Sequence, residues 1–416
     1  MKTRELQERI LHNICQENNK RIRIAGISGT ALSYLYSNIL SELKKPNLII
    51  LPTKKAAKQL YKELDFFIHG KQIYEFFPYD ISPLSGLNPH KDIIARRISS
   101  LYALLNHDNP VIITSFEAIL FNTIPKEVFI RCMEFFEPGE EIERDLLIRK
   151  LEETGYLRVS LVEEIGDYAV RGNVIDIFCP LYQNPVRLEF WGDTLESIRQ
   201  FDPFSQRSIS PMKEMIFIPC SEVILDDSAL KRARSMGKLP VSEDSRRNFS
   251  GKEAWLLHFY KKPDSIFEYL PEDTLITFFS FQSVNFLYEK TKKRFTRDVE
   301  RFRKDASEKG EPFPETNGLF LELTELKEKL NKFQRLELET SGPYEPETRL
   351  LEIEGYFDLR EDIELRIPQK GTVSLAPLVE KIAIWLNSKG KVVIITRTKE
   401  QAARLQQILN NYEVKV

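Results

Sequence analysis

The first 120 residues alternate between short apolar runs and amphipathic stretches, and this alternation constrains the fold more than any other feature. Runs that predict strands occupy 21–26, 46–52, 72–78 and 110–120, the last continuing into a helix. Between them, apolar residues recur at helical spacing over 30–43, 54–67 and 90–106. Repeated strand–helix units favour parallel strands with helices on both faces. The sequence therefore predicts the α/β class, with a parallel sheet at its start.

The character of the sequence changes near residue 125, where a second kind of unit begins. A Pro-Gly break is followed by a predicted amphipathic helix over 143–156, and then only strands are predicted as far as residue 219. We interpret this unit as an α+β insert built on an antiparallel sheet. The predicted segments are an α/β unit at 1–125, the insert at 126–212, a largely helical part at 213–341, a linker at 342–371, and the start of a further α/β domain at 372–416.

One predicted strand of the insert has an unusual outer face. Every other residue of 186–191 is apolar, and the residues between them are Arg187, Glu189 and Trp191. An apolar inner face is ordinary for a half-buried strand, but a Trp on the polar face is not. We therefore single out Trp191 as a candidate contact residue.

Composition narrows the class of protein. The 60 basic and 62 acidic residues give a net charge of −2, so no global field favours nucleic acid, although a local basic patch is compatible with it. The four cysteines form no CxxC pair, and the five histidines show no metal-ligand spacing. The N-terminus lacks the apolar core of a signal peptide, and no window has the apolar length of a membrane span. We expect a cytoplasmic protein with reduced thiols, no metal and no membrane partner.

A glycine-containing loop after the first predicted strand has the position of a phosphate-binding P-loop. In GISGTALS, Gly26 and Ser33 match the first and last places of G-x-x-x-x-G-K-[ST], and Gly29 lies between them. However, Ala31 replaces the second glycine and Leu32 replaces the lysine whose charge binds phosphate. An ordinary turn and a working ATPase are the alternatives. We favour a degenerate loop that has lost nucleotide chemistry.

Three motifs together resemble a known family. The degenerate loop, the segment FPYDISPLSGLNPHKDIIARRISSLYALL (77–105) and the segment from GDYAVRGNVIDIF to FDPFSQRS (166–208) are similar to the N-terminal UvrB-like module of bacterial transcription-repair coupling factors (Mfd). The resemblance covers essentially the whole chain. It implies a helicase-like domain 1a at 1–125, a domain 2 at 126–212, a domain 1b at 213–341 and the start of a third domain after 372. It also implies that the chain is a piece of a longer protein.

UvrB itself is the alternative member of this group. The UvrB pattern keeps a working GK[ST] loop and a long Tyr-rich hairpin that clamps DNA. Here the corresponding place, 79–92, is short and interrupted by Pro83 and Pro89. We therefore prefer the coupling factor and keep a UvrB-like DNA-binding or helicase subunit as the alternative.

The resemblance implies a function for domain 2. In the family this domain recruits UvrA, and the partner-binding positions map onto Arg171, Arg187 and Trp191, where the family more often has Phe at the last position. Each has a simpler interpretation: Arg171 as a solvated turn residue, Arg187 as a cross-strand partner of an acid such as Glu196, and Trp191 as a side chain packed under domain 1b or an adjacent loop.

The resemblance also divides activities between this chain and its parent. It implies no catalysis and no cofactor here, whereas the full-length parent would be a DNA translocase that uses ATP and Mg. RNA polymerase and DNA would be contacted by domains beyond this chain, and the rest of the parent would mask domain 2. No ligand is implied for the charged run 289–309, which we interpret as a solvated helix face.

Overall fold

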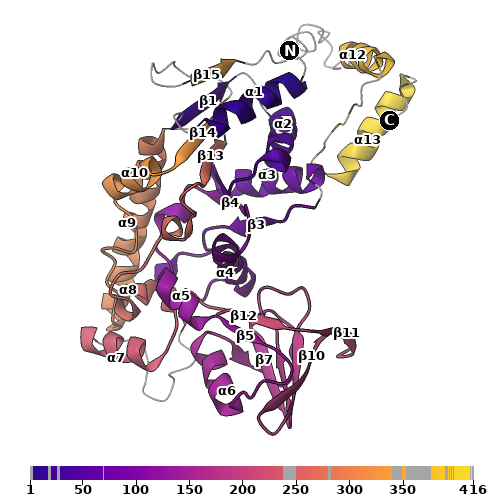
Figure 1. Ribbon diagram of the computed structural model, residues 1–416. Coiled ribbons are helices and arrows are strands. Elements are labelled where there is room, and N and C mark those ends of the chain that lie inside the picture. Colours follow the sequence, from indigo (N-terminus) through magenta and orange to yellow (C-terminus); the bar gives the residue numbers. More distant parts are fainter. Residues whose placement is uncertain are drawn as a thin grey trace.

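The computed structural model describes residues 3–16, 20–25, 29–68, 70–237, 250–279, 283–339, 349–352 and 376–388, together with 392, 394, 396, 398–412 and 414. Figure 1 shows an elongated molecule with a parallel sheet in its upper half and the insert at its lower end. Helix α4 (Lys91–Asn106) lies between these two parts.

The larger sheet has seven strands in the order β15-β1-β14-β13-β2-β4-β3, and every pairing is parallel. Its strands are β1 (Arg21–Ala25), β2 (Asn47–Leu51), β3 (Ile73–Phe76), β4 (Val111–Ser115), β13 (Leu275–Phe279), β14 (Gln334–Glu339) and β15 (Arg349–Glu352). The predicted α/β class with a parallel sheet is confirmed.

Helices cover both faces of this sheet, as continuous apolar strands require. Along β2, Ile49 and Leu51 pack on one side with α1 (Thr3–Cys15), α2 (Gly29–Glu42) and α3 (Lys54–Phe67). Leu48 and Ile50 pack on the other side, in the core that contains α4. The helix predicted over 54–67 begins and ends at the expected residues.

Two strands of this sheet were not predicted. β13 lies in the part expected to be largely helical, and β15 lies within the segment expected to be a linker. Both are short and pair with strands far away in sequence: β13 with β2, and β15 with β1. Such pairing is decided by long-range contacts, which a local pattern does not report.

The insert contains a six-stranded sheet in the order β11-β10-β9-β8-β7-β6. Its pairs are antiparallel except β6–β7. The strands are β6 (Leu157–Arg158), β7 (Asp167–Arg171), β8 (Val174–Ile177), β9 (Val186–Trp191), β10 (Thr194–Phe201) and β11 (Ser208–Met212). Helices α5 (Lys126–Cys132) and α6 (Arg144–Glu153) precede them. The expected α+β insert is present.

A separate two-stranded ladder joins the entry and exit of the insert. β5 (Glu134–Phe136) pairs antiparallel with β12 (Met215–Phe217), so strand pairing continues past the predicted boundary at 212. The inner face of the six-stranded sheet shares one apolar core with α4. The insert is therefore packed against the parallel-sheet part rather than tethered to it.

A buried ion pair lies where the two parts meet. Arg97 of α4 donates from Nη2 to Glu222 Oε2 at 3.0 Å, from Nε to Glu222 Oε1, and from Nη1 to the Phe77 carbonyl oxygen at 2.9 Å. Thr123 Oγ1 also donates to Glu222. The side chains of Arg97 and Glu222 are almost completely buried. We call Arg97, Thr123 and Glu222 the junction cluster.

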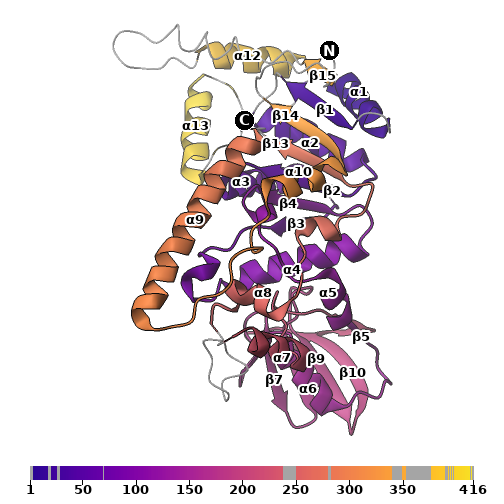
Figure 2. The ribbon, with the colours of Figure 1, turned by 90° about the vertical axis from the view of Figure 1, so that its left-hand side faces the viewer.

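The rest of the chain returns to the parallel sheet. It contains α7 (Asp227–Met236), α8 (Leu256–Phe259), α9 (Val284–Lys309) and α10 (Leu323–Asn331), with short 3-10 turns such as η3 (Lys252–Trp255). Figure 2 shows α9 as a long helix along one side of the molecule.

Two further helices, α12 (Ala376–Asn387) and α13 (Lys399–Asn411), pack together through Ile382 and Leu409. The strands that the predicted α/β domain at 372–416 would contribute fall largely outside the described residues. No helix in the described parts of the chain is long and apolar enough to cross a membrane.

Candidate partner-binding face of the insert

Strands β7 to β10 present a polar outer face on the side of the sheet away from the core shared with α4. Along β9, buried residues alternate with partly or fully exposed ones, as the sequence predicted. Six residues of this side lie around Asp176 or at the end of β9: Arg171, Asp176, Arg187, Glu189, Trp191 and Arg199. The same side also carries Asp167, which pairs with Lys91, and the buried Phe201 ring. We use the name outer face for the six residues named first.

Asp176 of β8 joins the two predicted arginines. Arg187 donates from Nε to Asp176 Oδ1 at 2.7 Å and from Nη2 to Oδ2 at 3.0 Å, and Arg171 Nη2 donates to the same Oδ2. The Asp176 side chain is 0% exposed, whereas those of Arg187 and Arg171 are 17% and 44% exposed. One buried carboxylate therefore holds two guanidinium groups, and a surplus positive charge remains at the surface.

The two arginines differ in how many of their guanidinium N–H groups remain available to a partner. Arg187 uses two donors on Asp176 and lies over the Phe201 ring, with its guanidinium carbon 4.5 Å from the ring centroid. The hydrogen bond to Asp176 outweighs burial and raises the pKa of Arg187. Arg171 is more exposed and contacts Asp176 through one nitrogen only. Arg171 is thus the better placed of the two to bind an incoming carboxylate.

Arg187 is the cross-strand partner of an acid, as its simpler interpretation suggested, but that acid is Asp176 rather than Glu196. Glu196 lies where the β9–β10 register shifts, and Asp176 is the cross-strand neighbour of Arg187 on β8. Asp176 was not among the candidate residues predicted from the sequence. A signal was available, because the two-residue Gly172–Asn173 hairpin fixes the register of β7 and β8.

Trp191 ends β9 beside a tight hairpin. Gly192 has φ +62°, a conformation that favours glycine, and Trp191 pairs with Thr194 across the turn. The Trp191 side chain is 73% exposed. The alternative that Trp191 packs under domain 1b or an adjacent loop is therefore wrong for this structure.

Comparison with known proteins bears on the same region. Residues 135–222 match the family described as the UvrB interaction domain, a span that contains the entire outer face. The transcription-repair-coupling factor of Myxococcus xanthus is 27% identical over 95% of this chain and 35% of its own length. That of Escherichia coli is 27% identical over 76% of this chain and 28% of its own length. The UvrABC system protein B of Campylobacter hominis is 30% identical over 55% of this chain and 37% of its own length.

Over most of its length the chain is similar to transcription-repair-coupling factors, and it contains a UvrB interaction domain. We refer to it as the coupling-factor module. The resemblance inferred from its motifs is confirmed. The coupling-factor module spans about a quarter to a third of the length of the coupling factors that it matches.

The rim of the outer face is held by further pairs within the coupling-factor module. Glu189 accepts a hydrogen bond from Ser197 Oγ at 2.6 Å and pairs with Arg199 Nη2 at 3.3 Å. Three arginines and two acids make up the charge of this face. Its net charge favours an acidic partner surface.

The glycine loop of the module is described only in part. Gly26 lies outside the described residues, whereas Gly29, at φ +60°, begins α2. Ala31 is exposed, but Leu32 is 5% exposed and belongs to the apolar core. Ser33 Oγ donates to Glu63 Oε2 of α3 at 2.5 Å. In this arrangement the Leu32 position supplies packing and the Ser33 hydroxyl is already hydrogen-bonded.

Proposed function

We propose that this module recruits UvrA, as the adaptor of a transcription-repair coupling factor, through the outer face of domain 2. The observation that carries the proposal is the combination of an exposed Trp191 with the arginine pair on Asp176. Trp and Arg are the residue types most enriched at binding hot spots. Burial of an exposed aromatic ring supplies apolar free energy, and the arginines select for acidic groups beside it.

The proposal assigns no catalysis and no nucleotide to this module. Leu32 stands where a phosphate-binding lysine would be needed, and its burial in the core removes the position from the loop surface. ATP and Mg would be used by the full-length parent, a DNA translocase that acts on stalled RNA polymerase. Polymerase and DNA contacts of that activity would lie outside this chain, and the rest of the parent would mask domain 2 until it engages.

Titration of UvrA with the module tests the proposal. Trp191→Ala should weaken binding by at least about 30-fold, the scale of a hot-spot residue, with little change in unfolding temperature because the ring is exposed. Phe204→Ala is the matched control, since Phe204 is an aromatic residue of the same insert, 92% exposed, and follows the opposite end of β10. Equal affinity of wild type and Trp191→Ala would refute the site.

A further inference from the structure

Two hairpin turns at one end of the six-stranded sheet follow directly on outer-face residues. Arg171 is the last residue before the β7–β8 turn, and Trp191 is the last residue before the β9–β10 turn. Since β8 lies between β7 and β9 in the sheet, and all these pairs are antiparallel, both turns emerge at the same end. The separation of Arg171 from Trp191 therefore depends on how the two turns are held relative to each other.

A segment outside both hairpins binds the second of these turns. Residues 139–144, which we call the strap, lead from β5 into the first residue of α6, and α6 lies beside the strands of the insert (Figures 1 and 2). Three backbone hydrogen bonds join the strap to the start of β10: Gly139 N–H to the Leu195 carbonyl at 2.7 Å, Leu195 N–H to the Glu140 carbonyl at 2.8 Å, and Ile142 N–H to the Asp193 carbonyl at 2.8 Å.

Arg144 extends the strap to the first turn. Its Nη2 donates to the carbonyl oxygen of Gly172 at 2.5 Å, and Gly172 directly follows Arg171. The guanidinium carbon of Arg144 also lies 5.6 Å from the ring centroid of Phe190, the residue directly before Trp191. Arg144 therefore contacts the immediate chain neighbours of both Arg171 and Trp191.

The link between the turns is otherwise slight. Regular pairing of β8 with β9 stops at Val174 and Glu189, and beyond it the Phe190 N–H donates to the Asn173 carbonyl at 2.9 Å. Each turn contains a glycine at positive φ, Gly172 at +56° and Gly192 at +62°, and glycine leaves the backbone more freedom than other residues do. A side chain that ties the first turn to the strap thus restricts a joint that the sheet itself holds loosely.

Arg144 reaches this joint from the inner side of the sheet. The Phe190 ring that it contacts is 2% exposed and belongs to the core shared with α4. Arg144 is consequently separate from the outer face, and any effect that it has on a partner is exerted through Gly172 and the turn. Fixing interface groups before binding lowers the cost of ordering them in the complex.

We propose that Arg144 is a positioning residue for partner binding, which holds Arg171 at a fixed separation from Trp191. The inference rests on the proposed function of the outer face. UvrA titration of Arg144→Ala tests it, and the affinity should fall by about 5–10-fold because the turn is no longer fixed. Arg149→Ala is the matched control, since Arg149 is an exposed arginine of the same helix, and its affinity should stay within about twofold of wild type.

Two further substitutions separate the hydrogen bond from the bulk of the side chain. Arg144→Lys keeps a charged N–H donor, and it loses little else, because Arg144 Nε has no hydrogen-bond partner among the described residues. Its affinity should stay within about threefold of wild type. Arg144→Met keeps the bulk without a donor and should lose as much affinity as Arg144→Ala. The opposite order of Lys and Met would show that Arg144 only fills space.

Double variants distinguish positioning from direct contact with UvrA. If Arg144 acts by fixing one residue relative to the other, its substitution should matter little once either Arg171 or Trp191 is already alanine. The effect of Arg144→Ala should then shrink to less than about twofold in both backgrounds. An undiminished effect in both would overturn the positioning role.

Hydrogen exchange gives a readout that does not need UvrA. The Phe190 amide, which donates to Asn173 between the two turns, should exchange at least about fivefold faster in Arg144→Ala than in wild type or Arg144→Lys. The amide of Ile175, which lies within the sheet and is fully buried, should exchange at an unchanged rate and serves as the internal reference. Unfolding temperature should shift by no more than about 4 °C.

The inference and the proposed function fail on different variants. Unchanged exchange of the Phe190 amide in Arg144→Ala would overturn the inference, as would unchanged UvrA affinity in Arg144→Ala when Trp191→Ala weakens binding. Unchanged affinity in Trp191→Ala itself would refute the UvrA site, and the inference would then be overturned with it.

Discussion

The junction cluster and the outer face use the same chemistry to different ends. In the junction cluster one arginine meets one carboxylate, and both side chains are almost completely buried. On the outer face two arginines share one buried carboxylate, and one of those arginines is 44% exposed. Charge is balanced in the first case and left in surplus in the second.

The difference shows what distinguishes an internal ion pair from a recognition site. Arg97 directs Nε, Nη1 and Nη2 to acceptors inside the protein. Arg171 uses one nitrogen on Asp176 and presents the rest of its guanidinium at the surface. The first arrangement holds α4 to the segment that leaves the insert, and the second holds a cation ready for a partner.

Removal of Arg97 gives the largest expected effect. Arg97→Ala leaves Glu222 charged, buried and without its cation, which should lower the free energy of unfolding by about 3–5 kcal/mol. Urea denaturation measures the change. The double variant Arg97→Met/Glu222→Leu should recover much of the loss, because no uncompensated charge remains. A loss below about 1 kcal/mol in Arg97→Ala would mean that water reaches the junction cluster and that its burial is not the stabilising feature.

Removal of the shared carboxylate should act mainly on recognition. Asp176→Asn deprives Arg171 and Arg187 of the group that fixes them, so UvrA affinity should fall by roughly tenfold, or about 1–2 kcal/mol. Calorimetric titration measures this affinity. Asp167→Asn is the matched control, because Asp167 of β7 is also buried but pairs with Lys91 at 2.9 Å.

A double-variant cycle separates positioning from folding. If Asp176 acts through Arg171, the effect of Asp176→Asn should be smaller in an Arg171→Ala background. Tighter UvrA binding by Asp176→Asn would contradict this role of Asp176. It would mean that Asp176 competes for the two arginines with a carboxylate of the partner.

The smallest effect is expected at Glu253, a buried acid next to the junction cluster. Within the part of the chain that the structure describes, neither carboxylate oxygen of Glu253 has a hydrogen-bond partner, and burial raises the pKa of this group. The folded state therefore holds the proton more tightly than the unfolded chain does. The stability that protonation contributes is full below the ordinary pKa and is lost as pH rises through the raised value.

Glu253→Gln removes this titration. We expect it to raise the free energy of unfolding on the order of 1 kcal/mol near pH 7.5 and by less near pH 5, as measured by urea denaturation. An equal increase in the free energy of unfolding at both pH values would contradict this. It would show that Glu253 does not titrate between them and that its carboxylate has hydrogen-bond partners in solution.

Much of the fold followed from local pattern. The helix over 54–67 and the alternation along β9 were predictable because helical and strand periodicities report burial directly. β13 and β15 escaped prediction because each is a short strand whose partners lie far away in sequence.

The candidate site was predictable in its residues but not in its geometry. Arg171, Arg187 and Trp191 could be named from the motifs, but the sharing of Asp176 between the arginines required the register of three strands. Whether these residues bind UvrA stays a prediction until it is measured.

The sequence by itself determined the class of fold, the loss of the P-loop lysine at Leu32 and the place of Trp191 on the polar side of its strand, because each depends on residues close together in the chain. The exposure of Trp191 was decided by the tertiary structure, which places no other described segment over it.

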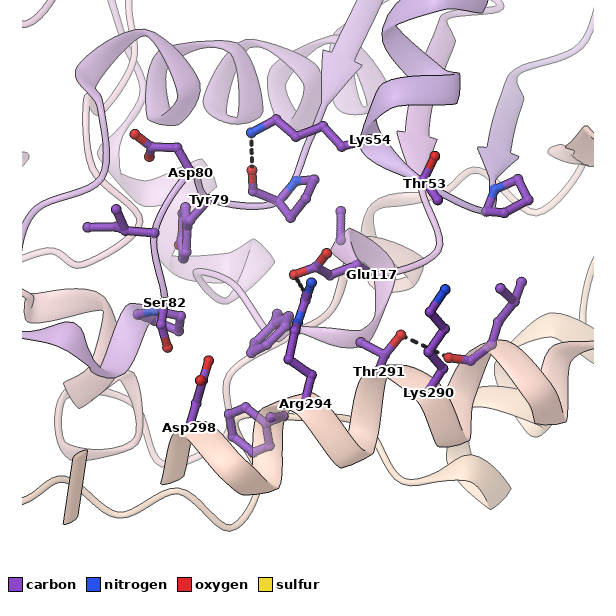
Figure 3. Close-up of a pocket in the computed structure, with 18 of the residues that line it drawn as sticks. Thr53, Lys54, Tyr79, Asp80, Ser82, Glu117, Lys290, Thr291, Arg294 and Asp298 are labelled. Atoms are coloured by element: carbon purple, nitrogen blue, oxygen red, sulfur yellow. Dashed lines mark hydrogen bonds and ion pairs between the residues drawn. The ribbon is translucent and has the colours of Figure 1, made fainter. Parts of the chain in front are cut away.

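Only the tertiary structure decided which charges are paired and which are left over. The run 289–309 illustrates this. It lies entirely within the helix α9, which has a solvated face as predicted, yet its residues Lys290, Arg294 and Arg297 line one cleft together with Lys54 and Lys55 (Figure 3). Electrostatic interaction depends on distance in space, and the chain order does not contain that distance.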